Sequence, residues 1–182
     1  MKTLVLVFHP NIQNSNVNRH LAEAANTKEG IIARDMYQLY PNFDIDVEEE
    51  KHQLEAVDRI VLQFPMYWYS SPALLKQWED VVLEHGWAYG STGDKLRGKD
   101  LLIAVTPGAS SDNYVHNKNF KYTVTDLLRP FQATSNLIGT RFVKPFIVAG
   151  ASSIEDAALE EFAKEYIEYL VKDQLELLND YE

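Results

Sequence analysis

Residues 3–18 read TLVLVFHPNIQNSNVN, an apolar run followed by a polar loop and the start of a helical pattern. The run over residues 3–8 is continuous rather than alternating, which is typical of a strand covered on both faces. Ser15 stands at an N-cap position, and apolar residues then recur at helical spacing, namely Val17, Leu21, Ala24 and Ala25. A buried strand that leads directly into a helix is the building unit of an open parallel α/β sheet.

The same alternation continues along the chain. Four more short apolar runs predict strands, over residues 30–33, 59–64, 101–106 and 142–148. Helical patterns lie between or after them, over about 46–57, 72–83, 123–137 and from 152 to the C-terminus. We therefore expect an α/β fold, a doubly wound five-stranded parallel sheet with helices on both faces.

Three local signals set the expected helix boundaries. Pro72 suits the first turn of its helix, and Pro130 should kink or break the helix over residues 123–137. Ser152-Ser153-Ile154-Glu155 has the spacing of a capping box, so the last helix is expected to begin there. Its apolar positions run at helical intervals as far as Leu177, which predicts a helix down to the C-terminus.

The composition limits the classes of protein to which the chain can belong. Its 182 residues fit one compact domain, 1–182, with a sizeable core. Seventeen Lys and Arg stand against 27 Asp and Glu, and the net charge of −10 disfavours nucleic acid and anionic membranes as partners. There are no cysteines, the five histidines show no metal-ligand spacing, and no apolar run approaches about 20 residues. We expect a cytoplasmic protein without a metal site.

Ligands of such sheets bind at the carboxyl ends of the strands, so the loops after the first, third and fourth strands form the candidate site. The loop over residues 9–18 runs into a helix N-terminus, whose free N–H groups favour an anion, and Ser15 and Asn18 add donors. It contains no glycine, so the Gly-rich phosphate-binding motifs do not apply. A simple capped helix is the alternative interpretation.

The other two loops differ from the first in their chemistry. Residues 63–72 place four aromatics on a segment without helix or strand spacing, and a flat heteroaromatic ligand would stack on them. A hydrophobic turn or a partner interface is the alternative there. Residues 106–114 are rich in small residues, which let backbone N–H groups approach a ligand oxygen. Together the three loops predict one site for a phosphate, a ring system and a polar edge.

Five blocks of the chain resemble the flavodoxin-like NAD(P)H:quinone oxidoreductases, namely 9–18 (HPNIQNSNVN), 63–68 (QFPMYW), 72–78 (PALLKQW), 106–114 (TPGASSDNY) and 127–134 (LLRPFQAT). The last block and the short chain are most similar to the bacterial branch, which includes ancillary subunits of glutathione-gated potassium efflux systems. The resemblance covers residues 1–150, roughly, and the block over residues 63–68 is the most specific.

The resemblance implies a bound flavin and assigns its contacts. The phosphate would lie on His9, Ser15, Asn16 and Asn18, and the isoalloxazine beside Pro65, Met66, Tyr67 and Trp68. The pyrimidine edge would face Thr106, Gly108, Ala109 and Tyr114. The implied cofactor is FMN, with FAD as the alternative, because the chain lacks the extra C-terminal region of longer FAD-binding relatives.

The implied activity is a two-electron, ping-pong transfer of hydride from NADPH or NADH through the flavin to a quinone. Backbone N–H groups and the Tyr114 hydroxyl would stabilise the negative charge that the ring gains. Two residues depart from the family pattern. Phe120 stands where the family has a catalytic histidine, with His116 in another register, and Ala109 replaces a glycine but keeps its N–H.

The resemblance also implies a homodimer in which Trp87 and Tyr89 of one subunit line the substrate pocket of the other. Trp and Tyr are enriched at interfaces, which favours the same interpretation. The alternative is that both rings pack under their own loop, and Ser91 replaces the second pocket aromatic of the long relatives.

A second class of function stays open, a regulatory flavoprotein that binds the cytoplasmic domain of a membrane transporter.

Two other classes of protein with this kind of sheet do not fit the sequence. A response regulator needs acidic residues where this chain has His9-Pro10 and Phe64-Pro65, and an electron-carrier flavodoxin has a Thr/Ser-Gly phosphate loop that is absent after the first strand.

Overall fold

A computed structural model of the chain describes residues 1–180, so the last two residues of the expected domain 1–182 lie outside the described residues. Its strands are β1 (Thr3–Val7), β2 (Ile31–Asp35), β3 (Arg59–Pro65), β4 (Asp100–Thr106), β5 (Arg141–Phe142) and β6 (Phe146–Ile147). Its α-helices are α1 (Asn16–Ala25), α2 (Met36–Leu39), α3 (Val47–Glu55), α4 (Ala73–Val82), α5 (Val124–Leu127), α6 (Arg129–Ile138) and α7 (Asp156–Leu170). One-turn 3₁₀ helices cover Ile12–Asn14 and Ser111–Asn113.

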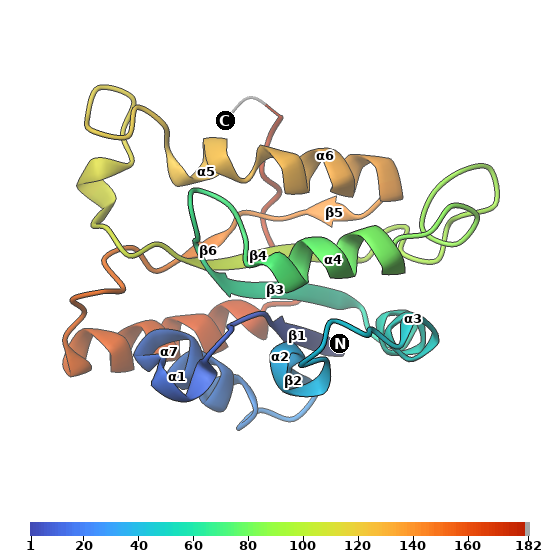
Figure 1. The fold of residues 1–182 in the computed structure, drawn as a ribbon, viewed down its shortest axis with the longest axis horizontal. Helices are drawn as coiled ribbons and strands as arrows, with labels where there is room; N and C mark the ends of the chain where they lie inside the picture. The colour runs from blue at the N-terminus through green and yellow to red at the C-terminus, as the bar shows by residue number, and fades with distance from the viewer. Residues whose placement is uncertain (181–182) are drawn as a thin grey trace.

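All strand pairs of the sheet are parallel, and the strand order is β2-β1-β3-β4-β5. Strand β6 also pairs with β4, further along β4 than β5 does. Every residue of β1, β3 and β4 is buried. Helices α1 and α7 pack on one face, while α3, α4, α5 and α6 pack on the other (Figure 1). The predicted doubly wound α/β sheet with helices on both faces is confirmed.

The fifth strand is interrupted, unlike the continuous strand expected over residues 142–148. Its two pieces, β5 and β6, pair with different parts of β4. Between them, the Lys144 N–H donates to Glu176 O instead of the sheet, at 2.8 Å. The next residue, Pro145, has no N–H to donate, so the sheet pairing stops at this point.

The helix expected over residues 123–137 is broken, as Pro130 predicted, and the break lies at Leu128. The capping box of Thr123 and Asp126 begins the short α5. Pro130 then occupies the first turn of α6, where its missing N–H needs no partner.

Both predicted ends of the last helix are wrong. Helix α7 begins at Asp156 without a side-chain cap, because the N–H groups of residues 150–152 bond the carbonyls of residues 107–109 and hold Ser152 away from the helix. It ends at Leu170, where the buried Arg59 guanidinium donates to Leu170 O at 2.7 Å and to Lys172 O at 2.8 Å. Beyond it the chain is irregular, and Leu177 forms an antiparallel bridge with Val143.

Within residues 1–180, none of the helices combines the length and the apolar character needed to cross a bilayer.

Candidate functional site

A cleft of about 430 Å³ lies at the carboxyl ends of β1, β3 and β4. The three loops singled out in the sequence all line it, and a fourth segment, before α7, closes it. The lining residues are His9, Asn14, Ser15, Asn16, Val17, Asn18, Pro65, Met66, Tyr67, Thr106, Gly108, Ala151 and Ser152. The fold therefore brings together nine of the residues predicted to bind a ligand.

The N-terminus of α1 forms the polar end of this cleft. The Ser15 Oγ accepts the Asn18 N–H at 3.1 Å, which confirms Ser15 as the N-cap. The Ser15 hydroxyl keeps its own proton for donation, and the N–H groups of the first helical turn have no partner within the helix. The positive end of the helix dipole adds to this field, so the arrangement favours an anion.

His9 adds a donor beside this helix end. Its Nδ1 accepts the Asn11 N–H at 3.1 Å, and burial lowers the pKa of its imidazole against the opposing effect of Asp35. A neutral ring that accepts at Nδ1 carries its proton at Nε2. His9 is therefore a neutral hydrogen-bond donor at neutral pH.

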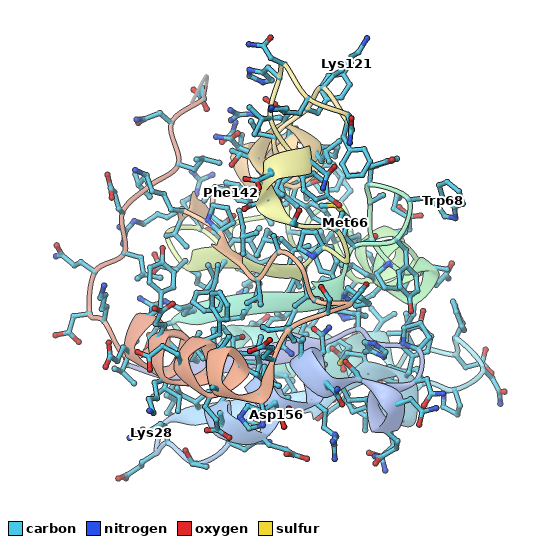
Figure 2. All side chains as sticks on the ribbon, turned by 90° about the vertical axis from the view of Figure 1, so that its left-hand side faces the viewer. Lys28, Met66, Trp68, Lys121, Phe142 and Asp156 are labelled. Atoms are coloured by element: carbon cyan, nitrogen blue, oxygen red, sulfur yellow. The ribbon has the colours of Figure 1, made fainter. Side chains whose placement is uncertain are left out.

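The apolar wall ends in a tight turn that presents aromatic rings. Tyr67 and Ser70 exchange backbone hydrogen bonds at 3.0 and 2.9 Å. Trp68 and Tyr69 between them have φ values of 48° and 62°, a conformation that aromatic residues rarely adopt. Trp68 is 92% exposed and projects away from the protein (Figure 2), so its side chain lies outside the cleft lining. Such backbone strain is typical of functional loops.

The third loop approaches the segment before α7 closely. A Cβ on Gly108 would lie 2.7 Å from Ser152 Oγ, so a larger residue there would require the Ser152 side chain to move. Sequence reasoning missed Ala151 and Ser152 as cleft residues, because the spacing of Ser152 suggested a helix cap. The only signal for the cleft was a pair of small residues after the last strand, one of them polar, which is too common to identify a site.

Tyr114 and Ala109 do not line the cleft. The Tyr114 ring packs against Phe120, with centroids 5.0 Å apart, and Phe120 in turn contacts Tyr69 at 5.5 Å. Burial raises the pKa of Tyr114, so its hydroxyl stays protonated. Among residues 1–180 no side chain or backbone group hydrogen bonds to that hydroxyl, which leaves it available to a ligand.

Trp87 and Tyr89 lie away from the cleft of their own chain. The Trp87 indole N–H donates to Glu55 Oε1 at 2.7 Å, and the Lys51 ammonium lies 5.6 Å from the ring centroid. Tyr89 packs edge-on against His85 and lines a separate groove of about 350 Å³ between α4 and α6. Any contribution of Trp87 or Tyr89 to a cleft therefore requires a second copy of the chain.

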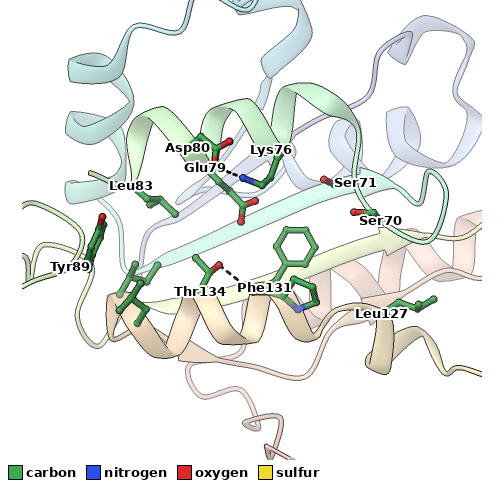
Figure 3. A pocket seen from close by; sticks show the side chains of 13 residues that line it. Ser70, Ser71, Lys76, Glu79, Asp80, Leu83, Tyr89, Leu127, Phe131 and Thr134 are labelled. Carbon is green, nitrogen blue, oxygen red and sulfur yellow. Dashed lines mark hydrogen bonds and ion pairs between the residues drawn. The ribbon is translucent and has the colours of Figure 1, made fainter. Parts of the chain in front are cut away.

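The α4–α6 groove contains a half-buried carboxyl group. Glu79 points from α4 toward α6, facing Phe131 and Thr134 (Figure 3). Burial raises the pKa of Glu79 to about 7, and the nearby Lys76, which pairs with Asp80, lowers it only in part. Glu79 is therefore partly protonated at neutral pH.

Replacing Glu79 with Gln is expected to stabilise the protein at pH 8 and to have little effect near pH 4. The native carboxyl holds its proton up to about pH 7, whereas the unfolded one loses it near its ordinary 4.5, so stability falls as pH rises through this window. This pKa shift corresponds to about 3 kcal/mol of unfolding free energy at most, and the partial exposure of Glu79 reduces the stabilisation expected from Gln to roughly 1–2 kcal/mol. Urea unfolding between pH 4 and pH 8 measures the difference in unfolding free energy. The exposed Glu165 on α7 is the control, and a gain independent of pH would contradict the assignment.

Within the described residues, no group of three or more His, Cys, Asp or Glu side chains is arranged to hold a metal ion.

The Flavodoxin_2 family model, described as a flavodoxin-like fold, matches residues 1–170. The chain is 48% identical over 170 residues to the uncharacterised NAD(P)H oxidoreductase YrkL of Bacillus subtilis, covering 93% of this chain and 98% of the relative. It is 40% identical over 168 residues to the glutathione-regulated potassium-efflux system ancillary protein KefF of Klebsiella aerogenes, covering 92% and 94%. The chain therefore belongs to the flavodoxin-like NAD(P)H:quinone oxidoreductase family, as its motifs indicated.

Solved structures agree on this fold. General stress protein 14 of Treponema denticola, in complex with FMN, has a TM-score of 0.87 and 36% identity, covering 93% of this chain and 98% of its own. An NADPH-quinone reductase of P. pentosaceus has a TM-score of 0.88 and 32% identity, covering 96% and 100%. A chain described as a thermophilic tryptophan halogenase of Streptomycin violaceusniger has a TM-score of 0.92 and 48% identity, covering 94% and 99%. Similar chains thus carry different activity names, and what they share is the fold.

Proposed function

We propose that the protein is an FMN-dependent NAD(P)H:quinone oxidoreductase of the cytoplasm. The observation that carries the proposal is the cleft itself, with an anion-favouring helix end at one side and an apolar aromatic turn at the other. The FMN complex of the similar general stress protein 14 and the names of the related oxidoreductases support it.

The donors at the polar end fit a phosphate monoester. The Ser15 hydroxyl, His9 Nε2–H and the backbone N–H of Asn16 are available to donate, and no carboxylate of residues 1–180 lines the cleft. Asn18 also has a structural role, because its side-chain amide donates one hydrogen bond to Thr106 Oγ1 at 2.7 Å. We therefore propose that Asn18 holds two loops of the cleft together. We propose FMN, rather than FAD, as the cofactor of the site.

The other end of the cleft has an apolar wall that suits a flat ring, formed by Pro65, Met66 and Tyr67. Thr106 and Gly108, on the loop after β4, line the cleft as well. A bound flavin supplies the redox chemistry, accepting hydride from NAD(P)H and passing two electrons to a quinone. The cleft residues would hold the flavin, and the two substrates would bind against it in turn. Tyr114 lies outside the cleft lining, but its hydroxyl has no partner within the described residues. We assign that hydroxyl to the polar ring edge, where a donated hydrogen bond would stabilise negative charge.

The test is to purify the protein, record its visible spectrum and identify the released cofactor by mass. The proposal expects FMN, bleaching of its absorbance by NADPH or NADH under anaerobic conditions, and recovery of the absorbance on adding a quinone. A protein that binds no flavin, or a bound flavin that NAD(P)H does not bleach, would overturn it.

We further propose a homodimer in which Tyr89 of each copy reaches the substrate end of the other copy's cleft. Tyr89→Ala is then expected to raise KM for the quinone about 2–10-fold, the worth of one aromatic contact, with flavin content unchanged. Dilution below the dimer dissociation constant should abolish quinone reduction while flavin is retained. Sedimentation that shows a fully active monomer at all concentrations would refute the shared site.

A second candidate is a regulatory subunit that binds the cytoplasmic part of a potassium-efflux transporter. The similarity to the ancillary protein KefF favours it. Co-purification with a transporter encoded beside this gene, and altered ion flux when this protein is deleted, would distinguish that role from a free-standing reductase.

A further inference from the structure

Four buried polar side chains from four elements form one chain of hydrogen bonds beneath the cleft. The Tyr166 hydroxyl on α7 donates to Gln63 Oε1 on β3 at 3.1 Å. Gln63 Nε2 donates to the backbone oxygen of Asn18 at 2.8 Å and lies 3.4 Å from its Oδ1. Asn18 Nδ2 donates to Thr106 Oγ1 at 2.7 Å. None of the four residues is more than 4% exposed, and two of them, Asn18 and Thr106, line the cleft.

The direction of this chain is fixed by the backbone oxygen of Asn18, which can only accept a hydrogen bond. Gln63 must therefore present its NH₂ group to Asn18 and its oxygen to Tyr166. Burial raises the pKa of Tyr166 far above its ordinary value, so its hydroxyl keeps the proton that it donates to Gln63. Asn18 in turn presents its oxygen to Gln63 and its NH₂ group to Thr106.

This order decides what Thr106 can do. Its oxygen accepts from Asn18, and its single proton has no acceptor among residues 1–180. Because the Thr106 side chain lines the cleft, that proton is left for a ligand. A threonine hydroxyl can ordinarily donate or accept, and here the Asn18 amide occupies one of its two acceptor positions, which favours the donor role toward a ligand.

We infer that Gln63 and Tyr166 are positioning residues that fix the Thr106 hydroxyl as a hydrogen-bond donor to an acceptor atom of the ligand in the cleft. The inference rests on the proposed function, in which that ligand is a flavin. Neither residue touches the cleft, so both act through Asn18 and Thr106.

The test is a double-mutant cycle that measures flavin binding rather than turnover. Quenching of flavin fluorescence by the apoprotein gives Kd for the wild type, Tyr166→Phe, Thr106→Val and the double variant. Thr106→Val is expected to weaken binding about tenfold, and Tyr166→Phe about threefold. In the Thr106→Val background, Tyr166→Phe should have almost no further effect, because the group through which it acts is gone.

Tyr169→Phe is the matched control. It removes a tyrosine hydrogen bond of the same helix, to Lys144 O at 2.8 Å, and should leave Kd unchanged. Gln63→Glu provides a second route, because only a protonated carboxyl can donate to the Asn18 oxygen. Its riboflavin affinity relative to wild type should therefore recover as the pH is lowered.

Equal effects of Tyr166→Phe in both backgrounds, or no effect in either, would overturn the inference while leaving the proposed function intact. A Gln63→Glu variant whose relative affinity does not depend on pH would also overturn it. A wild-type protein that binds no flavin would instead overturn the proposed function, and this inference with it.

Discussion

Ser15→Asp is expected to abolish FMN binding with the fold intact. Aspartate caps helices as well as serine does, so it retains the hydrogen bond to the Asn18 N–H. Its carboxylate, however, places a negative charge against the phosphate. Two like charges about 4 Å apart near a protein surface repel by roughly 4 kcal/mol, which corresponds to a loss of affinity on the order of 10³-fold.

Ser15→Asn is the matched control, because asparagine has the shape of aspartate, also caps helices and carries no charge. It should lose far less affinity, and riboflavin, which has no phosphate, should bind both variants with similar affinity. Titration of the apoproteins with FMN and riboflavin measures all four values. Equal FMN affinity of the Asp and Asn variants would place the phosphate elsewhere.

Tyr114→Phe is expected to slow flavin reduction by NAD(P)H about 10²-fold without emptying the site. Removal of one donor that stabilises developing charge typically costs about 10²–10³ in rate. The ring of Tyr114 packs against Phe120 and is almost fully buried, so phenylalanine fits the same space. The hydroxyl has no partner of its own within the described residues, so its loss leaves no protein group unsatisfied.

Stopped-flow measurement of the anaerobic half-reaction checks this expectation. Tyr122→Phe is a suitable control, because Tyr122 is an exposed tyrosine outside the cleft lining. Flavin content and melting temperature should match the wild type in both variants. A half-reaction at full speed in Tyr114→Phe would assign the tyrosine to packing alone.

Local patterns predicted those parts of the fold that local physics controls. The continuous apolar runs identified β1, β3 and β4, because a strand covered on both faces has no polar side. Ser15 marked the start of α1, since its cap bond lies within four residues. The rule that ligands bind at the carboxyl ends of such strands predicted the position of the cleft.

Contacts between distant segments decided the features that the sequence did not determine. The capping-box spacing at Ser152 failed because its neighbours bond the loop after β4, more than 40 residues earlier. Helix α7 stops at Leu170, although the apolar pattern continues, because Arg59 on β3 takes its last carbonyls.

Asn18 shows most clearly which features follow from local sequence and which from tertiary contacts. The sequence identified it as a cleft residue with an amide to donate, because it follows a helix cap after a buried strand. The tertiary structure decided which group accepts from that amide, because Thr106 lies 88 positions after Asn18 in the chain. Tyr166, which contacts the network through Gln63, lies on the last helix. Residue type and local spacing determine which hydrogen bonds a side chain can make. Only the packing of β3, β4 and α7 around α1 determines which of them it does make.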